Sequence, residues 1–324
     1  MTEASPPSST ALLPIARYRF TATVSDELLL PEYAGSLLRG IFGAALRRIC
    51  CMTGMPQCPL CPLYQTCPYP AIFEAPPRPT SLPQHFNQVA NPYVIEPPAP
   101  GRRRVQRGET LAFHMVLAGA DTLRNLPLII HAWQRALAHG VGPHRIPASL
   151  QTVHWVGEGE CVAVWSAGQT RVTEHDAGLY VPAYLPVETG DVCLDIETPM
   201  RLQHNGKPLS AAALSPRALL LAAARRITLL QDLYLGGRIE GLPPVEQLLQ
   251  AIPAVTDDRS QLRWHDWTRY SARQKQEMTL GGVVGRWRLS GNVAVAWPWL
   301  WLCQWLHIGK NATMGMGGYR LVSL

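Results

Sequence analysis

The chain has 324 residues, 47% of them hydrophobic, which is enough for one large core or two modest ones. It has no long uncharged apolar run and no basic segment followed by an apolar run at its start, which predicts a soluble cytoplasmic protein that neither spans a membrane nor is secreted. The net charge is +6, and all but three of the 29 basic residues are arginines, whose forked guanidinium groups suit phosphates and bases.

The first half of the chain predicts alternating strands and helices. Residues 1–10 are polar and rich in proline and serine, so we expect them to be disordered. A run of β-formers over 13–24 precedes a helical pattern over 31–49 that Pro31 opens. After a long irregular insertion at 50–105, three more elements are expected: a strand at 109–119, a helix at 124–138 and a strand at 149–156.

The insertion contains five of the eight cysteines, followed by proline-rich and arginine-rich passages. Such clustering argues against a disulfide framework and favours a metal site. Four thiolates can bind one structural Zn²⁺ in tetrahedral geometry, and the candidates are Cys51, Cys58, Cys61 and Cys67. An iron–sulfur cluster fits the same ligands, and reduced cysteines without metal are the third alternative.

The second half repeats the plan of the first. It predicts a strand at 191–203, a helix at 216–234 that Ser215 caps, a linker, a strand at 278–290, a helix at 298–306 and a final strand. Two βαββαβ units in tandem predict an α+β protein of two ferredoxin-like (RRM-like) domains, with a cleft between the sheets for an extended ligand. We assign the domains to residues 11–160, with the insertion at 50–105, and 190–324.

A glycine-rich segment, His307 to Arg320, follows the last predicted helix. Four glycines surround a lone lysine, Lys310; they are Gly309, Gly315, Gly317 and Gly318. Glycine permits positive φ, so successive N–H groups can point at a phosphate that Lys310 neutralises, with Arg320 beside it. The spacing does not fit a Walker loop, and a tight turn without a ligand is the alternative.

A basic and aromatic block, Trp267 to Lys275, lies upstream of this loop. Aromatic side chains stack on bases while cations follow phosphates, which is how proteins bind single strands. The cations expected to bind a nucleic-acid strand here are Arg269, Arg273 and Lys275. An ordinary exposed basic edge would look the same.

Four stretches, in the same order, give the chain a family resemblance. They are GSLLRGIFGAALRRIC with the following cysteines and CPYPAIFE, then TPMRLQHNGKPLS with RALLLAAARRITLL, then TRYSARQKQEMTLGGVVG, and finally HIGKNATMGMGGYRL. Together they resemble the CRISPR-associated endoribonucleases of the RAMP superfamily, which process precursor CRISPR RNA.

The resemblance implies recognition of a CRISPR repeat stem-loop and cleavage on its 3′ side. It implies a metal-independent reaction, in which the neighbouring 2′-OH attacks the phosphate and leaves a 2′,3′-cyclic phosphate and a 5′-OH, so no cofactor is required for catalysis. The implied partners are the repeat RNA, the mature CRISPR RNA and other Cas proteins of an effector complex, with no membrane.

The sequence departs from well-known members of that family, which have a histidine on the first helix. Residues 31–49 contain neither histidine nor lysine. Arg39, Arg47 and Arg48 are expected to orient RNA and stabilise charge, because arginine stays protonated and is a poor base. Of these, Arg39 and Arg47 are candidate catalytic residues, together with Tyr33. His307 is the first choice for the acid or base, followed by His265 and His85.

The missing histidine keeps a second function open. A catalytically inactive subunit that binds CRISPR RNA in an effector complex would need the same fold and the same basic surfaces. A third hypothesis is a zinc-stabilised protein whose basic faces contact other proteins. It leaves the glycine loop and the basic block unexplained.

Overall fold

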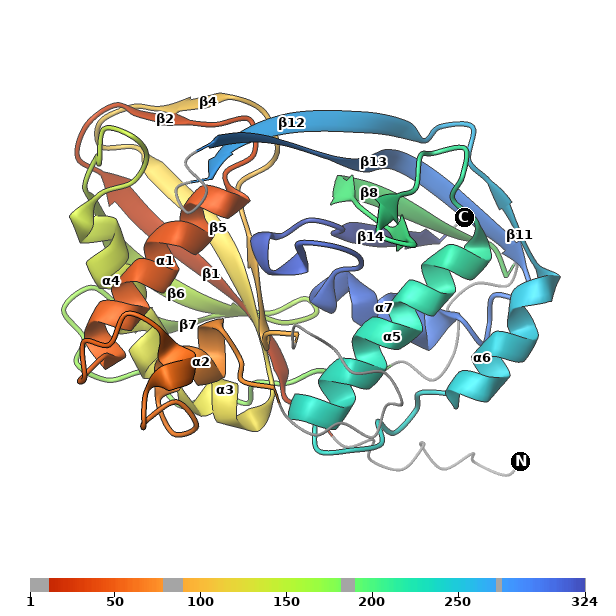
Figure 1. Ribbon diagram of the computed structural model, residues 1–324, viewed down its shortest axis with the longest axis horizontal. Helices are drawn as coiled ribbons and strands as arrows, with labels where there is room; N and C mark the ends of the chain where they lie inside the picture. The colour runs from red at the N-terminus through yellow and green to blue at the C-terminus, as the bar shows by residue number, and fades with distance from the viewer. Residues whose placement is uncertain (1–11, 78–89, 182–189, 272–275, 324) are drawn as a thin grey trace, which may run out of the picture.

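The computed structural model describes residues 12–77, 90–181, 190–271 and 276–323. The first half forms a five-stranded antiparallel sheet in the order β3-β5-β1-β6-β7 (Figure 1). Its strands are β1 (Ile15–Val24), β3 (Tyr93–Glu96), β5 (Thr110–Ala118), β6 (Ala148–Val156) and β7 (Cys161–Ser166). With α1 (Gly35–Cys50) after β1 and α4 (Leu126–His139) after β5, this is the ferredoxin-like plan with one added edge strand.

Short elements complete the first half. They are β2 (Leu28–Leu30) paired with β4 (Arg103–Val105), the 3₁₀ turn η1 (Cys58–Leu60), α2 (Pro68–Phe73) and α3 (Ala120–Arg124). The interval 50–105 is therefore more structured than expected, because β3 within it pairs with β5 and forms an edge of the sheet. This strand has only four residues and is bounded by prolines, so its sequence hides it.

The second half repeats the plan with the order β11-β13-β8-β14. Its strands are β8 (Val192–Met200), β11 (Val255–Asp258), β13 (Gln276–Gly291) and β14 (Tyr319–Ser323), and β12 (Arg263–Ser271) pairs with β13 to form a long hairpin. Its helices are α5 (Pro216–Tyr234), α6 (Val245–Ala251) and α7 (Trp297–Leu306). The short pair β9 (Gln203–His204) and β10 (Lys207–Pro208), with the turns η2 (Ile252–Ala254) and η3 (Ala312–Met314), completes it.

Both sheets show the fold expected from the sequence, two ferredoxin-like units in tandem. Helix α5 has the expected bounds, and the Ser215 hydroxyl accepts a hydrogen bond from the Ala218 N–H at 3.2 Å. The linker expected before residue 278 is wrong, however, because α6, β11 and β12 occupy it. No helix within the described part of the chain is long and apolar enough to cross a membrane.

The two faces of the first sheet have different partners. One face packs under α1 and α4 through aromatic side chains, among them Phe20, Phe113 and Trp133. On the opposite face, apolar side chains at one end of the sheet belong to the core of the second half; they are Ile15, Val94, Val116 and Ala118. The two halves therefore share a hydrophobic core, and the other end of that face remains open to a groove described below.

Candidate active site

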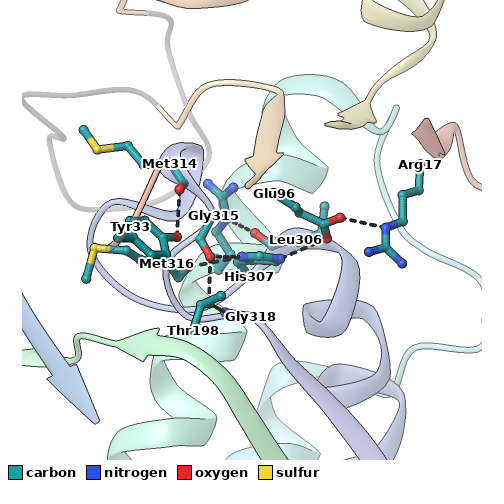
Figure 2. Close-up of polar contacts among 11 residues, drawn as sticks. Arg17, Tyr33, Glu96, Thr198, Leu306, His307, Met314, Gly315, Met316 and Gly318 are labelled. Carbon is teal, nitrogen blue, oxygen red and sulfur yellow. Dashed lines mark hydrogen bonds and ion pairs between the residues drawn. The ribbon is translucent and has the colours of Figure 1, made fainter. Parts of the chain in front are cut away.

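The glycine-rich segment after α7 lies against the first half of the chain. Its turn η3 packs on β3 and on the start of α1. The Tyr33 hydroxyl donates a hydrogen bond to the Met314 carbonyl at 2.8 Å (Figure 2). A Cβ on Gly315, where φ is +84°, would lie 2.5 Å from the Ile95 carbonyl oxygen. Glycine is thus needed here because backbone of the second half touches backbone of the first.

The amide groups of this loop donate within the protein. Among them, the Lys310 N–H donates to the Arg201 carbonyl, Gly315 to Ala312, Gly317 to Pro199 and Gly318 to Thr198 Oγ1, at 2.8–3.1 Å. These amides are engaged within the protein, and phosphate binding by the loop stays a prediction. Gly309, Gly315, Gly317 and Gly318 pack closely against neighbouring atoms of the protein. Only the Lys310 and Arg320 side chains are exposed cations of the loop, and Arg320 pairs with Glu197 at 2.5 Å.

His307 lies at the end of α7, with its side chain only 4% exposed. Its Nδ1 lies 3.0 Å from the Gly315 carbonyl oxygen and 3.2 Å from that of Met316, and its Nε2 lies 3.2 Å from Glu96 Oε1 (Figure 2). Carbonyls and an ionised carboxylate only accept hydrogen bonds, so both ring nitrogens of His307 face acceptors of the protein. The backbone at His307 has φ +56°, a strained conformation that these bonds maintain.

Glu96 joins His307 to the first sheet. Arg17 Nε donates to Glu96 Oε2 at 2.7 Å. Burial on its own raises the pKa of Glu96, but the hydrogen bond from His307 and the charges of Arg17, His307 and His114 outweigh it and lower the pKa to about 2. Glu96 is therefore a carboxylate under all ordinary conditions, held between a cation on β1 and a ring at the end of α7.

A groove of about 830 Å³ opens above this network, between the two halves. Its first wall comes from the strands of the first sheet and its second from α7 and β14. The polar and aromatic side chains that line it include Arg17, Glu96, His114, Glu158, Glu197, Trp305, His307 and Arg320. The residues 97–100, rich in proline, form one rim. A groove with cations, imidazoles and an aromatic ring can accommodate an anionic, unstacked chain.

Ionisable side chains cross the first sheet in one row beside the groove. Glu96 on β3 lies opposite His114 on β5, His114 opposite Arg19 on β1, and Arg19 opposite His154 on β6. Burial, and then the positive charges of Arg17 and Arg19, lower the pKa of His114 to about 4 against the opposing effect of Glu96. His114 is therefore neutral at pH 7.

The structure does not bring the expected catalytic residues together. Tyr33 is buried, its ring lies 4.7 Å from that of Trp267, and burial raises its pKa well above the usual value. The Arg39 guanidinium lies 4.3 Å above the Phe73 ring, and Arg47 Nη2 donates to the Met55 and Pro56 carbonyls. These contacts are structural, and His307 is the one expected catalytic residue that lines the groove.

The basic block is only partly described. Arg269 lies on β12 opposite Met278, and its side chain is outside the description. Arg273 and Lys275 lie outside the described residues, as does His85. His265 pairs with Glu32 through Nε2 and Oε1 at 3.2 Å. The RNA-binding role of this block stays a prediction.

The cysteine-rich loop joins α1 to α2, and its thiols form no disulfide. No three His, Cys, Asp or Glu side chains among the described residues lie close enough to share a metal ion. The backbone N–H of Gly54, then groups of Thr53, lower the pKa of the Cys51 thiol. Binding of zinc by Cys51, Cys58, Cys61 and Cys67 stays a prediction.

Several residues of the groove were not singled out from the sequence, among them Arg17, Glu96 and His114. Arg17 and His114 follow the alternation of their strands, in which polar residues take every second position. That alternation predicts that one face of the sheet carries polar side chains and is not buried in a hydrophobic core. Because the sheet was expected to border a cleft, such a polar face is a candidate site. Glu96 carried no signal, because its strand was not recognised.

The comparisons with known proteins agree with this architecture. A family model described as CRISPR-associated endoribonuclease Cas6 matches residues 194–319, and a model described as an N-terminal domain matches residues 13–177. No curated protein matches the chain.

Solved structures match 96% of the chain. A Cas6 product complex has a TM-score of 0.56 at 15% identity, and Thermus thermophilus Cas6 has 0.53 at 13%; both are covered over their whole length. A partial Cas6-RT-Cas1–Cas2 complex has a TM-score of 0.57 at 13% identity, and the chain spans only 46% of that longer polypeptide. At these identities the likeness shows the fold.

Two ferredoxin-like units in tandem, with a terminal glycine loop closing the second, are the fold that the chain shares with these Cas6 structures. Through residues 194–319 the chain belongs to the family of CRISPR-associated endoribonucleases, Cas6.

Proposed function

We propose that this protein cleaves CRISPR repeat RNA to release mature CRISPR RNA. The neighbouring 2′-OH attacks the scissile phosphate without a metal ion and leaves a 2′,3′-cyclic phosphate and a 5′-OH. The observation that carries the proposal is the groove between the two halves, where Arg17, His114, His307 and Arg320 line one continuous surface. The product complex of a Cas6 protein with the same fold supports an RNA ligand.

The groove supplies what this reaction needs. In-line attack requires a nucleophile held near the phosphorus atom, a group that accepts its proton and cations that stabilise the phosphorane. Arginine offers forked donors to phosphate oxygens, and Trp305 offers a surface on which a base can stack. Arg320 lines the groove, and Lys310, exposed on the same glycine loop, adds a cation outside it.

An inactive subunit that binds CRISPR RNA is the second candidate. Its specific support is that α1 has no histidine and that both ring nitrogens of His307 already face acceptors of the protein. Such a subunit would bind the repeat and present it to other Cas proteins without cutting it.

One experiment separates these functions. The protein is incubated in EDTA with its own repeat RNA, beside a copy that has a 2′-deoxy residue at the cleavage site. Cleavage of the first RNA alone, with a 2′,3′-cyclic phosphate on the upstream product, is the expected result. Tight binding of both RNAs in a gel shift, with neither cut, would replace the enzyme by the inactive subunit.

A further inference from the structure

The groove contains two histidines in different surroundings. Nε2 of His307 faces Glu96 Oε1 and Nδ1 faces two carbonyl oxygens, so both nitrogens of this ring are already occupied by groups of the protein. His114 is different. Among the described residues its ring nitrogens have no hydrogen-bond partner, although it lies half-buried on the groove wall. A lone pair that points to a groove is what a proton acceptor needs.

The surroundings of His114 keep that lone pair available. Arg17 and Arg19 on the neighbouring strand β1 oppose a positive charge on the ring, and Glu96 on β3 favours it. The other charged groups that line the groove come from elements beyond these strands: Glu158, Glu197, His307 and Arg320. The effects of burial and of the two arginines on the pKa outweigh the effect of Glu96, so the imidazole is neutral from about pH 5 upwards.

We propose that His114, on β5, is the general base of the cleavage reaction. Its imidazole takes the proton of the 2′-OH while O2′ forms a bond to phosphorus and the bond from phosphorus to O5′ breaks. The electron pair of that bond stays on O5′, which is protonated by water, and His114 later returns its proton to solvent. His307 and Glu96 then act as positioning residues that hold Arg17 beside the phosphate.

This inference rests on the proposed function, and its test begins with the wild-type protein. Single-turnover cleavage is measured in EDTA with protein in excess over repeat RNA. His114→Ala should slow cleavage by about a hundredfold or more, the usual contribution of a general base. Added imidazole should restore part of the rate to this variant, in proportion to the neutral fraction of the imidazole.

The matched control is His154→Ala. His154 is on the same face of the sheet as His114, but on β6, where it lies opposite Arg19 of β1. It does not line the groove. Its replacement should leave the rate within about threefold. Gel shift and thermal unfolding of both variants report any loss of RNA binding or of the fold.

The pH profile of the wild-type protein gives a readout that needs no variant. A base of low pKa predicts a rate that is flat from about pH 5 to 8 and falls only below that range. A rate that rises tenfold per pH unit between 5 and 7 would overturn the assignment, as would His114→Ala cleaving at the wild-type rate. If the wild-type protein itself cuts neither RNA, the proposed function fails instead.

Discussion

At the scale of single residues, the buried carboxylate of Glu96 bridges the two halves of the molecule. It pairs with Arg17 on β1 and with His307 after α7. Removing one partner of a buried ion pair leaves the charge of the remaining partner buried and unpaired, which costs about 3–5 kcal/mol of stability. We expect Glu96→Gln to lower the free energy of unfolding at pH 7 by about this amount, measured by urea denaturation.

An exposed ion pair provides the control for Glu96→Gln. Asp121 and Arg124 form a pair on the surface of α3, with side chains more than two-thirds exposed. Surface pairs contribute little because water screens them. Asp121→Asn should leave the urea midpoint unchanged. Equal losses of unfolding free energy in the two variants would show that the buried ion pairs of Glu96 stabilise the fold no more than an exposed pair does.

The depressed pKa of His114 predicts that the fold weakens in acid. The unfolded chain binds a proton to this histidine at its ordinary pKa of 6.5, whereas the folded chain does so only near pH 4. Stability is therefore lost as pH falls from 6.5 to 4, by up to about 3 kcal/mol from this residue. In the His114→Gln variant, the urea midpoint should depend less on pH over that range. An unchanged slope would mean that His114 titrates normally in the folded protein.

At the scale of elements, two glycines of α1 make opposite predictions. A Cβ on Gly35 would lie 1.9 Å from the Met314 carbonyl oxygen, whereas a Cβ on Gly40 would meet nothing within 4 Å. Gly35→Ala must push the glycine loop away, at a cost of about 3 kcal/mol. Gly40→Ala should raise the free energy of unfolding by about 0.5–1 kcal/mol, because alanine favours the helix. Thermal unfolding of both variants checks this, and a loss of stability in both would contradict the packing described for Gly35.

The cysteine-rich loop has too few buried apolar side chains to hold its own shape. Met52 is 88% exposed and Leu60 is 68% exposed. We expect about one zinc ion per chain in protein purified without chelators, measured by elemental analysis, and its loss in a Cys58→Ser, Cys61→Ser double variant. Cys161→Ser, outside the loop, is the control. Iron would indicate a cluster instead, and metal-free wild-type protein would reduce the loop to free thiols.

How far the sequence predicts an element depends on what determines it. Helix α5 was found at its true bounds because a serine cap, a first-turn proline and a helical pattern all agree. Strands β3 and β11 were missed because each has four residues and is fixed by its neighbours in the sheet. The glycine loop was located correctly, but the contacts of its amides were not predicted, because several of them come from distant segments that only the fold brings near.

At the scale of the whole molecule, the groove depends on the way the two halves meet. Its walls come from β1, β5, α7 and β14, which are far apart in sequence. His307 was singled out because it adjoins a motif, whereas Arg17 and His114 belong to no motif and become site residues only when the second half covers part of their sheet face. The periodicity of the sequence predicts the two sheets. The packing of one half on the other, which forms the site, depends on tertiary contacts that the sequence pattern does not show.

This shared face also predicts that the protein unfolds as one unit. Ile15, Val94, Val116 and Ala118, all at most 2% exposed, belong to the core of the second half, so separating the halves would expose them to water. We expect tryptophan fluorescence, weighted to the seven tryptophans after residue 260, and far-UV circular dichroism to report the same urea midpoint. Val116→Asp should lower both midpoints together, because it places an unpaired charge at the junction. Two resolved transitions in the wild-type protein would mean that each half is stable alone, and the groove would then lie between two bodies free to separate.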